Sequence, residues 1–172
     1  MQLNIPEINR PRVLVIGGGF AGLELAKALR GEEVQVVLID KRNYFTFSPL
    51  LYQVATGGLE PDSIAMPFRK IFNHQQNFIY RMAEVVSIDT ASNSVETSIG
   101  SIKFDYLVIA TGSSSNYFGL SDVQANGMPM KTIPEALNLR SLILQNLEKS
   151  LLVHDINEQL LLMNIVVVGG GP

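Results

Sequence analysis

The sequence predicts an α/β fold that combines a parallel sheet with an antiparallel β-meander. Three observations predict it. An apolar, β-branched run leads into a glycine-rich turn and then into a run of helix formers. A second apolar run follows and ends in an acidic residue. Later in the chain, short polar turns separate three extended segments. Apolar runs of this kind are typical of strands buried on both faces of a parallel sheet.

Composition sets the limits for the class of protein. The chain has 172 residues, of which 47% are hydrophobic and 17% charged, which is enough to bury a core and unlike a disordered chain. The net charge of −3 leaves no basic excess for a nucleic-acid backbone, so we expect no nucleic-acid partner. Cysteine is absent and only two histidines occur. This composition excludes disulfides, cysteine nucleophiles and thiolate or multi-histidine metal sites in this chain.

Neither a signal peptide nor a membrane-spanning run is visible in the sequence. The first twelve residues lack an apolar core, and no apolar run reaches the ~20 residues that a membrane span needs. We therefore expect a cytoplasmic, soluble protein.

The first element pair carries the strongest motif. Residues 12–16 read Arg-Val-Leu-Val-Ile and predict a buried strand. Residues 17–22 read Gly-Gly-Gly-Phe-Ala-Gly, a G-x-G-x-x-G. Residues 23–30 are strong helix formers, and Gly31 is placed to end that helix.

Each part of the motif has a physical task in binding a dinucleotide. Gly17 permits a tight turn, Gly19 lets a pyrophosphate approach the backbone, and Gly22 lets the helix pack closely on the strand. The helix N-terminus presents unpaired N–H groups to the phosphates. The next strand, residues 34–39, ends in Asp40, whose carboxylate is suited to a ribose diol. Strand, glycines, helix, strand and acid together predict a dinucleotide site.

The segment after Asp40 departs from a simple dehydrogenase pattern. Residues 41–60 form an aromatic, proline-containing loop with a short helix over 49–55, and helical turns are expected at 62–65 and 67–72. The pattern thus predicts neither a second amphipathic helix nor a third parallel strand at this point.

Three extended segments follow, at residues 78–90, 94–97 and 102–110. Their short polar connections predict an antiparallel meander. The last segment ends in a run over 106–110 that we expect to be a buried strand, and it leads into Thr111-Gly112.

A long helix is predicted near the end of the chain. Thr132 and Glu135 have the spacing of a capping box, and the helix should run to about Leu152. An apolar stripe along it is expected to pack in the core. The stripe consists of Ala136, Leu137, Ile143, Leu144, Leu147 and Leu151, with Arg140 among them.

The final residues repeat the start of the first motif. Residues 165–172 read Ile-Val-Val-Val-Gly-Gly-Gly-Pro, which matches the strand and glycines at residues 13–20. We interpret 12–163 as the first part of one dinucleotide-binding domain and 164–172 as the truncated start of a second. The chain is therefore expected to be a fragment.

Taken together, these motifs resemble flavoproteins with two dinucleotide-binding domains, and within them the type II NADH dehydrogenases (non-pumping NADH:quinone oxidoreductases). The resemblance implies a Rossmann-like, FAD/NAD(P)-binding three-layer domain. It covers residues 12–172. It is carried by GGGFAGL at 17–23, DKRNY at 40–44, FSPLLYQVA at 47–55, ATGS at 110–113, and Asn116 with Phe118-Gly119.

The resemblance implies a role for residues at each part of an FAD site. The pyrophosphate would meet Gly17, Gly19, Phe20, Ala21 and Gly22. The adenosine ribose would meet Asp40, with Lys41 beside it, and the adenine edge would meet the Val85 backbone. Ala110, Thr111 and Gly112 would flank the cofactor. The flavin ring would be approached by Thr46, Ser48, Pro49 and Leu50.

The family's activity is hydride transfer from NADH to FAD, followed by two-electron reduction of a quinone. No side chain of this chain is needed as a catalytic acid, base or nucleophile, because the cofactor carries the chemistry. The NADH site, the quinone site and a C-terminal segment that holds the parent on the cytoplasmic face of the membrane would lie beyond Pro172. The fragment itself is then expected to be inactive, and exposed surface is expected to allow a homodimer.

Two alternatives stay open from the sequence. One is the FAD-binding part of another pyridine-nucleotide flavoprotein, of the ferredoxin reductase or sulfide:quinone reductase type. The other is a structural fragment that binds no cofactor.

Overall fold

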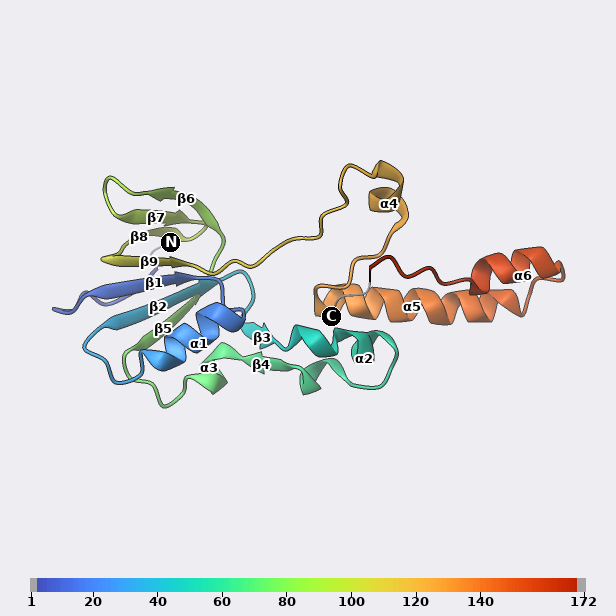
Figure 1. The fold of residues 1–172 in the computed structure, drawn as a ribbon. Helices are drawn as coiled ribbons and strands as arrows, with labels where there is room; N and C mark the ends of the chain where they lie inside the picture. Colours follow the sequence, from blue (N-terminus) through green and yellow to red (C-terminus); the bar gives the residue numbers. More distant parts are fainter. Residues whose placement is uncertain (1–2, 170–172) are drawn as a thin grey trace. The chain divides into compact units, whose positions relative to one another are not determined.

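The computed structural model describes residues 3–169, which fall into two compact units (Figure 1). The first unit contains Met1–Phe45 and Ala65–Ser113, and the second contains Thr46–Ile64 and Ser114–Pro172. The chain therefore leaves the first unit after Phe45, returns at Ala65, and leaves it again after Ser113.

The centre of the first unit is a four-stranded parallel sheet in the order β5-β2-β1-β9. Its strands are β1 (Arg12–Ile16), β2 (Gln35–Asp40), β5 (Phe78–Met82) and β9 (Tyr106–Ile109). Ile16 pairs with both Ile39 and Ile109, so the carboxyl ends of the three neighbouring strands lie level. Whatever follows these strands is brought to one edge of the sheet.

Side chains on the central strand alternate between two cores. Val13 and Val15 pack with residues of α1 (Phe20–Ala28) and α3 (Phe68–Ile71). Leu14 and Ile16 pack on the opposite face with Val95 and other residues of the meander. Because both faces are covered, β1 is buried along its whole length, as the apolar run predicts.

The meander is a three-stranded antiparallel sheet, β6-β7-β8. It consists of β6 (Val85–Asp89), β7 (Ser94–Thr97) and β8 (Gly100–Lys103). Figure 1 shows α1 and α3 on one side of the parallel sheet and the meander on the other. The three-layer fold with a parallel sheet and a meander is confirmed.

The second unit is helical. It contains η1 (Ser48–Leu50), α2 (Leu51–Ala55), η2 (Pro61–Ser63), α4 (Ser121–Asn126), α5 (Ile133–Ser150) and α6 (Ile156–Met163). Both α2 and α6 pack against α5. A short two-stranded sheet joins β3 (Tyr44–Thr46) to β4 (Ala65–Pro67), where the chain passes between the units.

Several local expectations are confirmed. The predicted short helix over 49–55 is η1 followed by α2, and the expected turns at 62–65 and 67–72 are η2 and α3. The capping box at Thr132 and Glu135 is present, and α5 ends at Ser150. Helix α1 ends at Ala28, and Gly31 follows in the left-handed region with φ of +81°.

The expectation that no third parallel strand follows β2 is wrong. Residues 78–90 form two strands: β5 pairs in parallel with β2, and β6 begins the meander. The break between them is Ala83-Glu84, where the Ala83 N–H still donates to the Asp40 carbonyl at 3.0 Å. No glycine or proline marks this break, and apolar, strand-favouring residues lie on both sides of it.

Residues 102–110 are likewise two strands. Residues 102 and 103 belong to β8, and β9 starts at Tyr106. Strand β9 is also more exposed than expected, with Tyr106 at 61% and Ile109 at 63%. In the described part of the chain it forms an edge of the sheet, so one side of it has no neighbouring strand.

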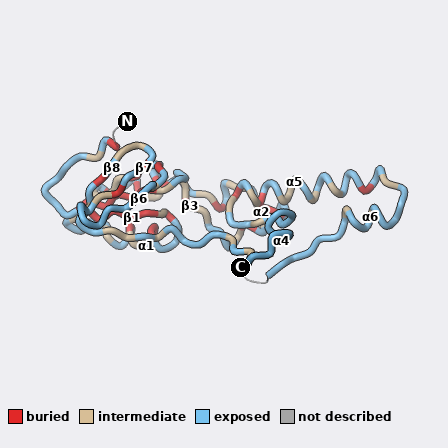
Figure 2. Tube along the Cα trace, turned by 90° about the horizontal axis from the view of Figure 1, so that it is seen from above, coloured by how far each residue is buried: buried red, intermediate tan, exposed pale blue. Residues whose placement is uncertain are grey.

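The apolar stripe of α5 does not pack in a core as expected. Leu137, Leu144, Leu147 and Leu151 are exposed, whereas Ile133 and Ala136 are buried. Figure 2 shows that most of α5 is exposed or half-buried. Two short helices are too small to cover all sides of an 18-residue helix.

The expected strand at 165–168 is not formed. These four residues are 65–83% exposed and are assigned to no strand. An isolated strand is not stable without a neighbour to satisfy its backbone groups. Gly170–Pro172, the end of the second glycine motif, lie outside the described residues.

Candidate dinucleotide-binding site

The turn after β1 is locked to the end of β9. Gly17 has φ of +99°, which is unfavourable for any residue with a side chain. A Cβ at this position would lie 2.4 Å from the Ala110 carbonyl oxygen and 3.0 Å from the Thr111 nitrogen. The Gly17 N–H donates to the Ile39 carbonyl at 2.8 Å. The tight turn predicted for Gly17 is therefore present, and it holds the three strand ends together.

Two further glycines are required by close packing. A Cβ at Gly22 would lie 1.9 Å from the Gly17 carbonyl oxygen, so α1 can begin against the turn only because Gly22 has no side chain. A Cβ at Gly18 would lie 2.2 Å from the ring of Phe68. The sequence motif does not include Gly18, although the run of three glycines signals that another position has no room for a side chain.

Gly19 is different from its neighbours. Its φ of −70° is accessible to any residue, and no protein atom lies within 4 Å of the place a Cβ would take. Packing inside the protein therefore gives no reason for glycine here. Open space above a glycine at a turn is what the close approach of a phosphate group requires.

Gly19 is also the N-cap of α1, and its position favours an anion. The cap has no side-chain hydrogen bond, and the first turn contains no acidic residue. The first helical bond runs from the Leu23 N–H to the Gly19 carbonyl at 2.9 Å. The preceding N–H groups of the first turn have no acceptor within the helix. They and the helix dipole provide a site for negative charge.

Asp40 is the last residue of β2 and lies beside the glycine turn. Its Oδ2 accepts the Gly18 N–H at 2.6 Å, and its Oδ1 accepts the Arg42 N–H at 2.8 Å. The side chain is thereby held directly beside the glycine turn. A carboxylate has about four acceptor positions, so two remain for the hydroxyls of a ribose.

Lys41 points to another partner. Its Nζ lies 2.6 Å from the Glu84 carboxylate, and both side chains are exposed. Because Glu84 neutralises the positive charge of Lys41, this lysine is poorly suited to bind the 2′-phosphate of an NADP-type dinucleotide. Val85 follows Glu84, is half-buried, and starts β6 opposite Thr97.

The segment after β9 contains the remaining predicted site residues of the first unit, Ala110, Thr111 and Gly112. Ala110 donates its N–H to the Ile16 carbonyl at 2.8 Å, and Thr111 and Gly112 are exposed beyond it. Gly112 has φ of +71°, and a Cβ there would meet no protein atom within 4 Å. The structure thus brings the glycine turn, Asp40 and the 110–112 segment together at the carboxyl ends of β1, β2 and β9.

The four residues expected at the flavin ring lie in the second unit. Ser48, Pro49 and Leu50 form η1, in which Ser48 and Pro49 are exposed. The Thr46 Oγ1 is buried and has no hydrogen-bond partner among the described residues. A buried hydroxyl without a partner is uncommon and is suited to a polar ligand atom.

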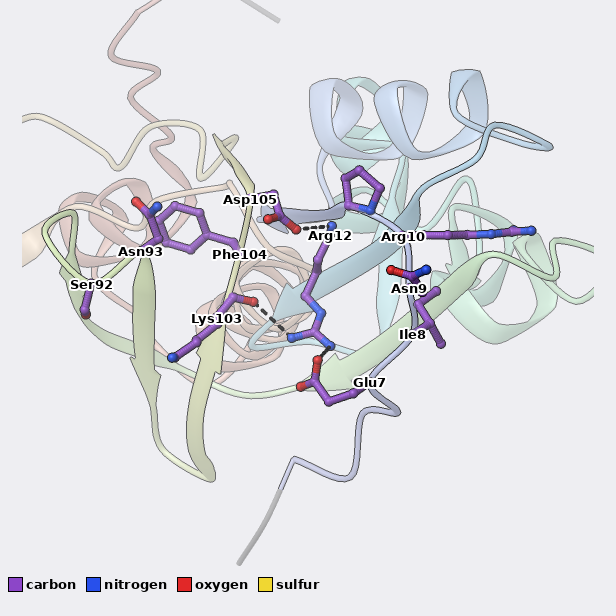
Figure 3. A pocket seen from close by; sticks show the side chains of 11 residues that line it. Glu7, Ile8, Asn9, Arg10, Arg12, Ser92, Asn93, Lys103, Phe104 and Asp105 are labelled. Carbon is purple, nitrogen blue, oxygen red and sulfur yellow. Dashed lines mark hydrogen bonds and ion pairs between the residues drawn. The ribbon is translucent and has the colours of Figure 1, made fainter.

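A separate cavity of about 560 Å³ lies at the opposite edge of the sheet (Figure 3). Arg12 opens β1 there and is buried. Its guanidinium donates to Gln35 and to the Lys103 carbonyl and pairs with Glu7 at 3.1 Å, while its N–H donates to Asp105. These bonds satisfy a buried charge and fasten the N-terminal segment to the sheet. The cavity therefore lies far from the glycine turn, at the other end of β1.

The described residues contain no cluster of acidic, histidine or cysteine side chains able to hold a metal ion. Among the helices described, none combines the length and hydropathy needed to cross a membrane.

Comparison with known proteins agrees with this geometry. The family model for pyridine nucleotide-disulphide oxidoreductases matches residues 11–172. The chain belongs to this family. The match covers nearly all of the chain, including the glycine turn, Asp40 and the 110–112 segment.

Individual members of the family are similar to it. The chain is 39% identical over 95% of its length to the type II NADH:quinone oxidoreductase NdhA of Mycobacterium tuberculosis, of which it covers 36%. The structure of NDH2 from Plasmodium falciparum in complex with NADH matches 88% of this chain with a TM-score of 0.79 and 27% identity, and the chain covers 32% of it. The sulfide:quinone oxidoreductase of Aquifex aeolicus matches 81% of this chain with a TM-score of 0.73 and 33% identity, again over 32% of that protein. The chain thus spans about a third of the length of these relatives.

Proposed function

We propose that this chain is the FAD-binding part of an NADH:quinone oxidoreductase. The observation that carries the proposal is Gly19, which no packing contact requires to be glycine and which caps a helix free of acidic residues in its first turn. Asp40 beside it has acceptor capacity left for a ribose. The residues present therefore fit an adenine dinucleotide, and the 39% identical relative is a type II NADH:quinone oxidoreductase.

The pyrophosphate of FAD would contact Gly17, Gly19, Phe20, Ala21 and Gly22. Because the Gly17 N–H already donates to the Ile39 carbonyl, the N–H donors would come from the first turn of α1. Asp40 would bind the adenosine ribose, and the Val85 backbone would meet the adenine. Around the rest of the cofactor we propose contacts from Lys41, Thr46, Ser48, Pro49, Leu50, Ala110, Thr111 and Gly112. The unpartnered Thr46 hydroxyl supports a polar contact.

Bound FAD would accept a hydride and pass two electrons on. The residues of this chain bind and orient the cofactor, and none is proposed to transfer a proton. The glycine turn neutralises the pyrophosphate charge with backbone dipoles, which need no reorganisation when the ligand arrives.

The remaining functions would belong to other parts of the full-length protein. We propose that residues 12–163 form the first part of the FAD domain and that 164–172 start the NADH domain. NADH and quinone would bind only in the full-length protein, held at the cytoplasmic face of the membrane by its C-terminal part. The division is supported by the NdhA relative, a type II NADH:quinone oxidoreductase of which this chain covers 36%.

A second candidate is the FAD-binding part of a sulfide:quinone oxidoreductase, which the 33% identical structure favours. That chemistry depends on thiols, and this chain has no cysteine. The two candidates differ in the reductant that the full-length protein accepts, NADH or sulfide.

We further propose that the isolated chain forms a homodimer through the exposed apolar residues of α5 and α6. Leu144 of α5 and Leu161 and Met163 of α6 are among those at least half exposed, and such surface favours association. Analytical ultracentrifugation of the chain at about 100 µM tests this proposal, because a dimer with a Kd below that concentration would be visible. Sedimentation of monomer alone would reject it.

The experiment that tests the cofactor proposal is a titration of the chain with FAD, followed by flavin fluorescence. Asp40→Ala should weaken FAD binding by about tenfold or more, because the ribose loses a charged acceptor. The matched control is Asp105→Ala. Asp105 also accepts a backbone N–H of the sheet, from Arg12, but at the opposite edge.

The control variant should lose stability yet keep its FAD affinity. Equal loss of affinity in both variants would show that the effect of Asp40 is only structural. Wild-type chain that binds no FAD at concentrations up to about 100 µM would count against a competent site in this chain.

A further inference from the structure

We propose that Phe68, supported by Tyr80, is a positioning residue that sets the geometry of the glycine turn and of Asp40 for the dinucleotide. Neither residue belongs to the glycine motif, and neither is proposed to touch the cofactor. The inference rests on the proposed FAD site and explains how the glycine turn and Asp40 are held in a fixed position relative to each other.

The ring of Phe68 lies directly against the turn. The side chain is completely buried, and a Cβ added to Gly18 would lie 2.2, 2.6 and 3.0 Å from three atoms of its ring. Helix α3 is only four residues long, so its position depends on such packing. The ring fills the space below Gly18 and thereby limits where the Gly18 N–H can point.

The backbone of Phe68 holds the other half of the site. Its N–H donates to the Asn43 carbonyl at 3.0 Å, in the segment that follows Asp40. One residue therefore contacts the glycine turn through its ring and the segment after β2 through its backbone. Between these two contacts lies the hydrogen bond from the Gly18 N–H to Asp40 Oδ2.

Tyr80 performs the same task from the neighbouring strand β5. Its ring centroid lies 5.2 Å from that of Phe68, and its hydroxyl donates to the Arg42 carbonyl at 2.9 Å. Arg42 in turn donates its N–H to Asp40 Oδ1. Both oxygens of the Asp40 carboxylate are therefore held indirectly by the Phe68–Tyr80 pair. Oδ2 accepts the N–H of Gly18, which packs on the Phe68 ring, and Oδ1 accepts the N–H of Arg42, whose carbonyl accepts the Tyr80 hydroxyl.

A matched control lies close to Phe68 in the sequence. Phe72 follows α3 directly, is 4% exposed and stacks on Phe78 at 3.8 Å. It belongs to the same core, but the atoms nearest to a Cβ at Gly17, Gly18 or Gly22 belong to other residues. Phe72→Leu and Phe68→Leu remove similar apolar volume, so they separate loss of stability from loss of positioning.

The test measures FAD affinity and the hydrogen exchange of the Gly18 amide in the full 172-residue chain. Phe68→Leu should weaken FAD binding by about tenfold and speed Gly18 exchange, while the Gly17 amide keeps its protection. Tyr80→Phe should act in the same direction, by about threefold, through loss of the Arg42 contact. Phe72→Leu should lower the melting temperature similarly without changing either readout.

A double variant tests the contact itself. Gly18→Ala places a methyl group against the ring and should weaken FAD binding, and Phe68→Leu should make room for it. The double variant should therefore bind FAD more tightly than two independent losses predict. Additive losses would overturn the proposal.

Two other results would also overturn it: wild-type Gly18 protection in Phe68→Leu, or equal loss of FAD affinity in Phe72→Leu. If the wild-type chain binds no FAD, the proposed function fails for this chain. Gly18 exchange then decides the positioning proposal alone, because it needs no ligand.

Discussion

Gly17 and Gly19 stand two positions apart but differ in what a methyl group would meet. At Gly17 it would meet the Ala110 carbonyl at 2.4 Å, in a backbone conformation with positive φ. At Gly19 it would meet no protein atom within 4 Å. The first glycine is therefore required by the fold, and the second has no structural requirement and is explained by a ligand.

This difference makes a prediction. Gly17→Ala should lower the free energy of unfolding by about 2–5 kcal/mol, through strain and overlap. Gly19→Ala should cost only about 1 kcal/mol, because alanine is a poorer N-cap than glycine, and should still weaken FAD binding by about tenfold. Urea denaturation and FAD titration of both variants check this. A Gly19→Ala chain that binds FAD as tightly as wild type would contradict a pyrophosphate contact here.

Tyr80 gives a prediction on pH dependence. Burial raises the pKa of its hydroxyl to about 12, with the negative charge of Asp40 adding to this and Arg69 opposing it. Since the unfolded chain loses this proton near pH 10, the unfolded state binds fewer protons between pH 10 and 12. Stability should therefore fall as the pH rises through this window.

Tyr80→Phe removes this titration and should flatten the decline relative to wild type, although the variant is less stable at pH 7 because it loses the bond to Arg42. Chemical denaturation at pH 9, 10 and 11 measures the two slopes. Identical slopes would show that Tyr80 does not titrate differently in the folded state.

At the scale of elements, helix α5 begins with a complete capping box. The Glu135 N–H donates to Thr132 Oγ1 at 3.3 Å, and the Thr132 N–H donates to the Glu135 carboxylate at 2.9 Å. Thr132→Ala should lower the stability of the second unit by about 1 kcal/mol. Ser141→Ala, at an exposed position within the same helix, serves as the control and should be neutral or slightly stabilising. Equal destabilisation in both would argue against the cap.

The limits of prediction from sequence are clearest at the element scale. Residues 12–16 and 34–40 could be assigned because each apolar run has a clear boundary, the glycine turn or an acid. The runs at 78–90 and 102–110 each change sheets without a glycine or proline to mark the change. Which sheet a strand joins depends on pairing with distant residues, such as Val36 with Phe78.

At the scale of the whole molecule, this chain offers one complete dinucleotide motif. The first G-x-G-x-x-G lies between strand β1 and helix α1, whereas residues 165–168, which precede the second glycine run, form no strand. The chain spans about a third of the NdhA relative. Since hydride transfer from NADH to FAD requires both dinucleotides to be bound, one site is insufficient.

We therefore expect the purified 172-residue chain to oxidise no NADH, with or without added FAD and a soluble quinone. Loss of absorbance at 340 nm, the wavelength of reduced nicotinamide, measures this directly. Steady NADH consumption above that of free FAD would contradict the assignment of NADH and quinone binding to other parts of the full-length protein.

The sequence by itself determined the first β-α-β unit, its glycine turn, its acidic residue and the capping box, because these depend on residues within about forty positions of each other. Only the tertiary structure decided why Gly18 is glycine, which atoms hold Asp40, and where β5 and β9 lie. Those features depend on Phe68, Tyr80 and Ala110, which are distant along the chain and adjacent in space. Local preference cannot report a contact whose partner lies fifty or more residues away, as the Gly18–Phe68 contact does.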